Sequence, residues 1–300
     1  MIQSQDTQML IQQMVRAQSL PPQFETSAQR WYLPLCRQIL ARQKNKQGTL
    51  YVAINGCQGS GKSTMAKFVE MILTQIHGLT VANLSIDDFY LTRKEREHLA
   101  AHIHPLLITR GVPGTHDIPL AINTLKNLAS DHKSISLVRF NKAIDDRAEP
   151  EDWQKIDGPA DVVILEGWCV GLSAQSESEL YDPINELESR EDANCRWRNY
   201  VNEQMRDHYS DLFDMFDMLI MLQAPSFDCV FQWRSLQEQK LRQHARFGTH
   251  IMDDHELARF IQHYQRLTEH ALNTLPQQAD IVFKMSEYQT FTQVHGLEVK

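Results

Sequence analysis

Two hydrophobic patterns alternate along most of the chain. From Thr49 onward, short apolar runs rich in Val, Ile and Leu are separated by longer stretches with the periodicity of amphipathic helices. This alternation is typical of parallel strands joined by helices. We expect strands over Leu50–Asn55, Thr80–Ser85, Asp161–Glu166, Met218–Gln223 and Asp280–Met285. We expect helices over Lys62–His77, Asn194–Tyr209, Ser226–Ala245 and Asp253–Asn273.

The predicted strands are apolar on both faces, and such strands must be covered on both faces. The sequence therefore predicts an α/β fold, a three-layer α/β/α sandwich with a mostly parallel sheet.

Two segments depart from this pattern. Residues 1–47 are interrupted at Pro21 and Pro22, which predicts two helices, the second over Ala28 to Lys44, in an N-terminal helical extension to a domain of residues 48–300. The segment Ser173–Asp192 contains acidic residues and the single base Arg190, and we expect most of it to be a solvated loop. Its acids are Glu177, Glu179, Asp182, Glu186, Glu188, Glu191 and Asp192.

Composition narrows the class of protein. The 300 residues are 42% hydrophobic and 23% charged, as in ordinary globular proteins, and the net charge of −8 argues against a nucleic-acid-binding surface. The apolar runs fall far short of the roughly 20 residues that span a bilayer, and the N-terminus lacks the features of a secretion signal. The 5 cysteines form no CxxC pair, which indicates reduced thiols. We expect a cytoplasmic protein with no membrane, nucleic-acid or obligate protein partner.

A phosphate-binding motif follows the first predicted strand. The segment GCQGSGKS fits the pattern GxxxxGK[ST], lies after LYVAIN and is followed by a helical pattern. Its backbone amides and the helix N-terminus favour phosphate, whereas the alternative is a glycine-rich turn without a ligand. We expect Lys62 to reach the terminal phosphates and Ser63 to bind Mg²⁺. The predicted nucleotide-binding residues are Gly56, Cys57, Gln58, Gly59, Ser60, Gly61, Lys62, Ser63 and Thr64.

Carboxylates follow two other predicted strands. Asp87 and Asp88 lie at the end of the second strand, where open α/β sheets assemble their sites, and one of them can accept a proton from an attacking hydroxyl. The alternative is that Asp88 caps the following helix. Glu166 ends the strand VVILEG, where it would hold Mg²⁺ or orient the hydroxyl. The chain has no NKxD guanine motif, because Ile144 stands where Asp is required.

These motifs together resemble a known family. GCQGSGKST, SIDDFYLT, RGVPGTHD, FNKAIDDR, ILEGWCVG and QWRSLQEQKLR are similar to segments of plant-type D-glycerate 3-kinase and its bacterial and fungal relatives, within the P-loop group of uridine kinase, phosphoribulokinase and pantothenate kinase. The resemblance runs from about Leu50 to Met285. It implies that residues 48–300 are a P-loop kinase domain, that ATP and Mg²⁺ are used, and that the acceptor is D-glycerate or a similar small acid.

The resemblance also implies site residues. The catalytic base maps onto Asp87, with Asp88 as the fallback, and Asp87 joins Ser63 and Glu166 as a metal ligand. The segment Arg110–Asp117 corresponds to a substrate loop that supplies Arg110 and His116, although it fits a plain turn capped by Asp117 as well. Further candidates around the acceptor are Tyr90, Lys142, Arg147 and Trp168, and a lid would carry Arg234, Arg242 and Arg246.

Each of these assignments has an alternative. Lys142 and Arg147 also fit a solvated basic loop, and Trp168 fits a core position. A uridine- or pantothenate-type kinase is the rival enzyme, but the cations Arg110, Lys142 and Arg147 favour an acid over a nucleoside. A regulatory nucleotide-binding switch is the rival from another class.

Overall fold

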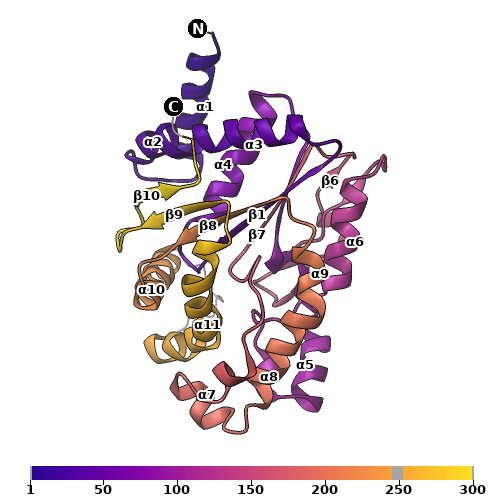
Figure 1. Ribbon diagram of the computed structural model, residues 1–300, viewed down its shortest axis with the longest axis vertical. Coiled ribbons are helices and arrows are strands. Elements are labelled where there is room, and N and C mark those ends of the chain that lie inside the picture. Colours follow the sequence, from indigo (N-terminus) through magenta and orange to yellow (C-terminus); the bar gives the residue numbers. More distant parts are fainter. Residues whose placement is uncertain (1, 245–252, 299–300) are drawn as a thin grey trace.

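A central sheet organises the protein (Figure 1). The structure is a computed structural model that describes residues 2–244 and 253–298. Within these residues, six strands pair in the order β10-β9-β8-β1-β7-β2, parallel except for β10 against β9. Their bounds are β1 Leu50–Gly56, β2 Val81–Ser85, β7 Val162–Gly167, β8 Met218–Gln223, β9 Ile281–Met285 and β10 Phe291–His295.

The five predicted strands are confirmed. The additional strand β10 escaped prediction because it lies at the sheet edge and its side chains are partly or fully exposed, so it lacks an apolar run. Two short ribbons were also not predicted. They pair β3 (Ile135–Ser136) with β6 (Lys155–Ile156), and β4 (Phe140–Asn141) with β5 (Asp146–Arg147).

Helices cover both faces of the sheet, as the apolar strands require. Successive strand residues point to opposite faces, so Val52 and Ile54 join one apolar cluster while Ala53 joins the other. The first cluster includes residues of α1 (Ile2–Ala17), α3 (Leu33–Asn45), α4 (Lys62–Gln75) and α10 (Phe227–His244). The second includes residues of α6 (Ile118–Leu128), α8 (Arg196–Gln204) and α11 (Asp254–Thr274). The three-layer sandwich is therefore confirmed.

Shorter helices complete the chain. They are α2 (Phe24–Ser27), α5 (Arg93–His102), α7 (Glu186–Glu191) and α9 (Ser210–Phe213). The predicted helix over Asn194–Tyr209 consists of α8 and a π-helical turn, Met205–Tyr209, and a similar turn, Ala28–Tyr32, precedes α3. None of the helices in the described ranges is long and apolar enough to cross a membrane.

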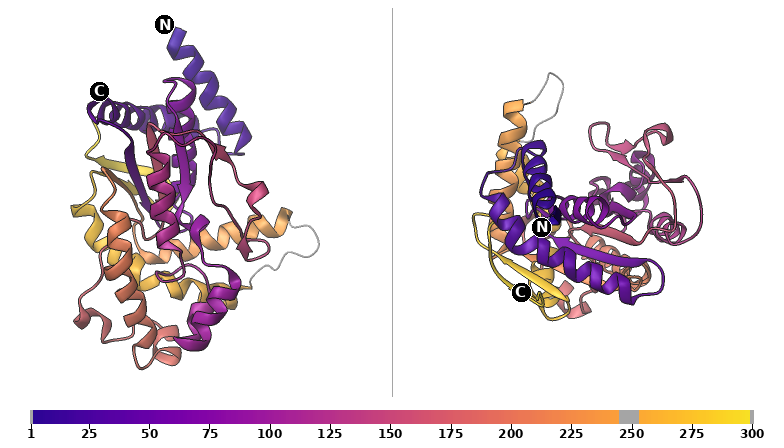
Figure 2. Two further views of the ribbon diagram at one scale, coloured as in Figure 1. Left: turned by 90° about the vertical axis from the view of Figure 1, so that its right-hand side faces the viewer. Right: turned by 90° about the horizontal axis from the view of Figure 1, so that it is seen from above.

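The N-terminal helices share a core with the sheet. Ile11 of α1, together with Leu35 and Ile39 of α3, is buried in the same cluster as Val52. Arg42 Nη2 also lies 2.7 Å from Asp280 Oδ1, which ties α3 to the start of β9. Figure 2 shows the N-terminal helix α1 at the periphery of the molecule. The boundary between residues 47 and 48 stays a prediction.

Most residues of Ser173–Asp192 are exposed as expected, but the prediction of a solvated loop is wrong for the helix α7 and for two of the segment's acids. Glu188 lies on α7 with its side chain fully buried, and Asp192 is 1% exposed. Burial of these charges is compensated by Arg198 Nη1, 3.1 Å from Glu188, and by Arg266 Nη2, 2.6 Å from the same carboxylate. The acid-rich composition suggested solvent exposure, but these acids are compensated by Arg198 of α8, 10 residues after Glu188, and by Arg266 of α11, 78 residues after it.

Candidate functional site

The loop between β1 and α4 has the backbone of a phosphate cradle. Gly59 and Gly61 have φ values of +82° and +88°, a conformation that residues with a Cβ rarely adopt. A Cβ on Gly59 would also lie 2.6 Å from Cβ of Trp233. Gly61 is the N-cap residue of α4, so the positive end of this helix faces the loop. The hydroxyl of Ser60 is buried without a hydrogen-bond partner among the described residues.

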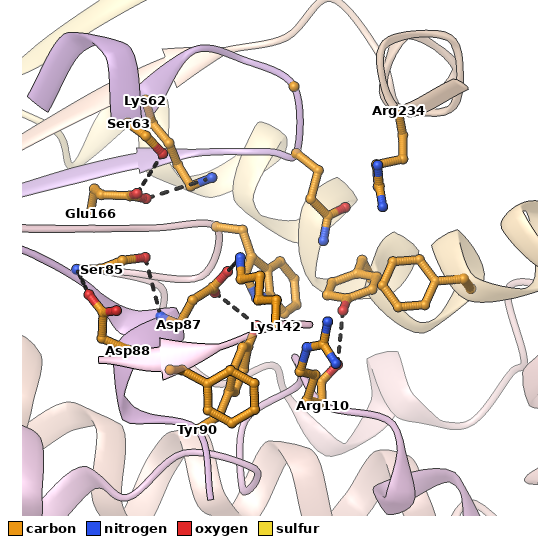
Figure 3. Close-up of a pocket in the computed structure, with 16 residues that line it drawn as sticks. Lys62, Ser63, Ser85, Asp87, Asp88, Tyr90, Arg110, Lys142, Glu166 and Arg234 are labelled. Carbon is orange, nitrogen blue, oxygen red and sulfur yellow. Dashed lines mark hydrogen bonds and ion pairs between the residues drawn. The ribbon is translucent and has the colours of Figure 1, made fainter. Parts of the chain in front are cut away.

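Lys62 and Ser63 meet Glu166 at the carboxyl ends of β1 and β7. The Ser63 hydroxyl donates to Glu166 Oε1 at 2.6 Å, and Lys62 Nζ lies 3.6 Å from Oε2 (Figure 3). Burial disfavours the charge of Lys62, but Glu166 and Asp87 outweigh it and raise the pKa of the ammonium. Lys62 therefore stays cationic in the cavity.

The same group of residues fits a Mg²⁺ ion. Glu166 is 6% exposed, and its Oε2 has no hydrogen-bond partner among the described residues. Mg²⁺ takes one or two protein oxygens and completes its shell with water and phosphate oxygens, so Ser63 and Glu166 suffice as protein ligands. The described residues contain no group of three His, Cys, Asp or Glu side chains that could hold a metal by themselves.

Asp87 points into the cavity from the turn that follows β2. Strand β2 ends at Ser85, as predicted, and the two aspartates lie in a 3₁₀ turn, Ile86–Phe89. Lys142 Nζ lies 2.6 Å from Oδ2 of Asp87, and the Tyr90 hydroxyl donates to Oδ1 at 2.8 Å. Burial opposes the charge, but Lys142 and Lys62 overcome it and lower the pKa of Asp87 to about 2. Asp87 is therefore an ionised carboxylate that can receive a proton.

Asp88 serves the backbone instead. Its Oδ2 accepts from the amide of Ser85 at 3.1 Å, while the Ser85 hydroxyl accepts from the amide of Asp87 at 3.3 Å. Ser85, and not Asp88, is thus the N-cap residue, and Asp88 closes a capping box. Arg139 Nη1 lies 2.8 Å from Asp88 Oδ2. Burial raises the pKa of Asp88 although Arg139 lowers it.

A cavity of about 420 Å³ opens over these groups. Its wall includes Gln58 and Gly59 of the phosphate loop, Asp87, Asp88 and Glu166, together with Arg110, Lys142 and Arg234. Figure 3 shows Lys62, Ser63 and Glu166 on one side of the view and Arg110 and Arg234 on the other. The cavity therefore joins a phosphate cradle, a carboxylate and several cations.

An ion pair and a backbone hydrogen bond fix the position of Arg110. Its Nη1 contacts Oδ1 of Asp145, whose Oδ2 lies 3.0 Å from Nη2 of the buried Arg96. The Tyr264 hydroxyl donates to the carbonyl of Arg110 at 3.0 Å. Since two arginines share one aspartate, the cluster keeps a net positive charge beside the cavity.

Trp168 is both buried and part of the cavity wall. It is 4% exposed, and its indole N–H donates to the carbonyl of Gly111 at 2.9 Å, so it is a core residue. One part of the same ring lines the cavity, where it makes an edge-to-face contact with Tyr264 at 4.9 Å between centroids. Trp168 thereby joins the loop at Gly111 to the cavity wall.

Two predicted acceptor residues do not line this cavity. His116 is buried under Tyr90, with 4.7 Å between the ring centroids, and its Nδ1 lies 2.6 Å from the Tyr209 hydroxyl. Burial lowers the pKa of His116 to about 4, so the ring is neutral at pH 7. Arg147 Nη2 lies 3.4 Å from Asp117, which caps α6. The capping of α6 by Asp117 agrees with the turn that the sequence allowed for Arg110–Asp117, whereas Arg147 is paired with an acid rather than free in a solvated loop.

The predicted lid falls only partly on described residues. Arg234 of α10 lines the cavity (Figure 3). Arg246 and the side chain of Arg242 lie outside the described residues.

Sequence reasoning missed several residues of the wall. Phe260 and Tyr264 come from α11, and Phe140 comes from β4. Asp145 and Arg139 were also missed, although they orient Arg110 and Asp88. The i,i+4 spacing of Phe260 and Tyr264 predicts only a buried helix face, and nothing local to it points to a ligand.

Comparisons with known proteins agree on the kind of enzyme. The chain is 31% identical over 253 residues to the uncharacterized kinase mug58 of Schizosaccharomyces pombe, covering 79% of this chain and 86% of that protein. It is 28% identical over 257 residues to the chloroplastic D-glycerate 3-kinase of Arabidopsis thaliana, covering 78% of this chain and 52% of the plant protein. No protein-family model matches the chain.

A solved structure agrees on the fold. The D-glycerate 3-kinase from Cryptococcus neoformans superposes with a TM-score of 0.73, over 90% of this chain and 98% of the fungal chain. The sequences are 23% identical. At this identity the match establishes the shared fold alone.

Proposed function

The chain belongs to the family of P-loop kinases that contains the D-glycerate 3-kinases, and on this premise we propose that it phosphorylates a hydroxyl of D-glycerate. The γ-phosphoryl group of ATP would be transferred to form 3-phosphoglycerate. The observation that carries the proposal is the single cavity that brings the phosphate cradle, the ionised Asp87 and the cation Arg110 together.

The donor half of the reaction rests on the phosphate loop. Its backbone amides and the N-terminus of α4 receive the phosphates, and the Lys62 ammonium neutralises charge on the moving phosphoryl group. Ser63 and Glu166 would hold the Mg²⁺ ion, which supplies positive charge to the phosphate oxygens. The sequence also suggested Asp87 as a metal ligand, but its contacts with Lys142 and Tyr90 favour the role of base.

Asp87 is the proposed general base. Its carboxylate faces the cavity in the ionised form, and it lies on the same edge of the sheet as Lys62. As the acceptor oxygen forms its bond to the γ-phosphorus, the bond from that phosphorus to the bridging oxygen breaks and its electrons leave with ADP. The hydroxyl proton passes to Asp87.

The acceptor half rests on charge. Glycerate carries a carboxylate, and burying it without a partner is very costly. Arg110 offers a guanidinium, which binds carboxylates in a bidentate manner, and Lys142 adds a second cation nearby. The aromatic side chains of Trp168, Tyr264 and Phe260 form the apolar part of the wall.

An acceptor panel tests the proposal. We would measure ADP release by a coupled assay with D-glycerate, L-glycerate, glycerol, uridine and pantothenate in turn. D-glycerate should give the highest kcat/KM, and glycerol should be poor because it leaves the cations without their partner. If uridine or pantothenate surpassed D-glycerate, the acceptor would be wrong while the kinase assignment would stand.

A further inference from the structure

Lys142 reaches the proposed base from the tip of the β4–β5 ribbon. Its Nζ lies 2.6 Å from Oδ2 of Asp87, and the Tyr90 hydroxyl donates to Oδ1 at 2.8 Å. Figure 3 shows the ammonium of Lys142 beside the carboxylate of Asp87. Both oxygens of Asp87 therefore already have a partner in the cavity.

The contact of Lys142 differs from those of neighbouring cations. The Lys142 side chain is 58% exposed and sits where only two residue pairs join β4 and β5. Arg139, by contrast, is 29% exposed and bonds the carbonyl of Asn83 as well as Asp88. Asp87 itself is 26% exposed, but an exposed cation can exchange partners more readily than a half-buried one, because water replaces its contacts and the long side chain gains freedom on release. The ion pair of Lys142 with Asp87 should therefore break more easily than the ion pair of Arg139 with Asp88.

A base beside bound ATP poses a chemical problem. A carboxylate that accepts a proton from a substrate hydroxyl can also accept one from water, and ATP is then hydrolysed. In that side reaction the water oxygen bonds to the γ-phosphorus, the bond to the bridging oxygen breaks with its electrons on ADP, and the water proton goes to the carboxylate. A cation bound to the carboxylate stabilises its negative charge and makes it a poorer proton acceptor.

We propose that Lys142 is a positioning residue that restrains Asp87 and suppresses transfer to water until an anionic acceptor draws its ammonium away. The carboxylate of the acceptor provides the competing anion, while its hydroxyl takes the place of the ammonium at Asp87. Selection for an acid then comes from release of the base as well as from binding. The inference rests on the proposed function for the donor ATP and the base Asp87, but it does not require the acceptor to be D-glycerate.

The test is ATP hydrolysis without any acceptor. We would measure ADP and inorganic phosphate for the wild type, Lys142→Met, Lys142→Gln and Lys142→Arg. A positioned base contributes about 10²–10⁴-fold, so recovering part of its strength should raise the rate by about tenfold in both uncharged variants. Lys142→Arg keeps the cation and should stay near the wild-type rate. The matched control is Lys155→Met, at an exposed lysine of β6 outside the cavity, which should hydrolyse ATP as the wild type does.

A double-mutant cycle with Asp87→Asn shows whether Lys142 acts through the base. The rise caused by Lys142→Met should disappear in the Asp87→Asn background. A rise that persists there, or an unchanged or lower rate in both uncharged variants, would overturn the inference. With D-glycerate added, Lys142→Met should release more ADP than phosphorylated product, whereas the wild type should release equal amounts. If D-glycerate is not phosphorylated by the wild type, the proposed acceptor fails, and the measurements without acceptor still decide the role of Lys142.

Discussion

Replacement of Arg110 by methionine tests which of two arginines binds the acceptor carboxylate, a choice that the sequence left open. Arg110 and Arg147 were equal candidates for the acceptor carboxylate, but Arg110 lines the cavity and Arg147 pairs with Asp117 outside its wall. Arg110→Met should therefore raise the KM for D-glycerate strongly, and Arg147→Met should leave it nearly unchanged. Methionine keeps much of the volume of the arginine stem, so the wall should remain filled.

The magnitude follows from the loss of a charged hydrogen bond. Such bonds contribute roughly 1.5–3 kcal/mol, and each 1.4 kcal/mol changes an equilibrium about tenfold, so the KM should rise about 10- to 100-fold. We expect the lower part of that range because Lys142 remains as a second cation. The fold should persist, since Asp145 keeps Arg96 as its partner 3.0 Å away.

The assay is initial-rate kinetics of ADP release with D-glycerate varied at saturating ATP, then with ATP varied at saturating D-glycerate. The KM for ATP should change less than the KM for D-glycerate, because Arg110 lies across the cavity from Lys62 in Figure 3. A larger effect from Arg147→Met than from Arg110→Met would refute the reasoning. Equal increases of both KM values in Arg110→Met would also refute it, since they would indicate a general disturbance of the site.

Further predictions concern the phosphate loop, the base and the pH dependence of stability. Lys62→Ala should abolish turnover with an unchanged circular dichroism spectrum, and normal activity in this variant would remove the phosphate-loop assignment. Asp87→Asn should lower kcat by about 10²–10⁴ with little change in ATP affinity, whereas Asp88→Asn should chiefly lower the melting temperature, and the reverse result would mean that the wrong aspartate was chosen. Burial lowers the pKa of His116 and His263 to about 4, so the unfolded chain takes up protons that the folded chain refuses as the pH falls from about 6.5 to 4. The free energy of unfolding in urea should fall over that window, by up to about 3 kcal/mol per histidine, and His263→Phe should make the fall smaller. An identical fall in that variant would contradict the assignment.

The fold was accessible from the sequence wherever burial was complete. Strands β1, β7 and β8 lie in the middle of the sheet, so both of their faces are apolar and their sequences have no competing interpretation. Strand β10 pairs along one edge and keeps polar residues such as Gln293, so its pattern resembles that of a loop. The phosphate loop was predictable for a different reason. Its glycines and Lys62 act through local backbone geometry, which a contiguous motif can record.

The acceptor side was less accessible because its residues are selected by distant partners. Whether a basic residue faces the cavity depends on the acid that holds it, as Asp145 holds Arg110 and Asp117 holds Arg147. Aspartate is a common residue in the sequence, and the spacing between each of these two aspartates and its arginine does not predict that they pair. The burial of Glu188 likewise depends on residues outside its own segment, because the two arginines that pair with it lie 10 and 78 residues away. An acidic stretch is therefore a poor predictor of solvation until its cations are known. The positive charge of the cavity depends on ion pairs that only the fold creates. Kinetic measurements on variants of Arg110 and Lys142 therefore test directly whether the site selects a negatively charged acceptor.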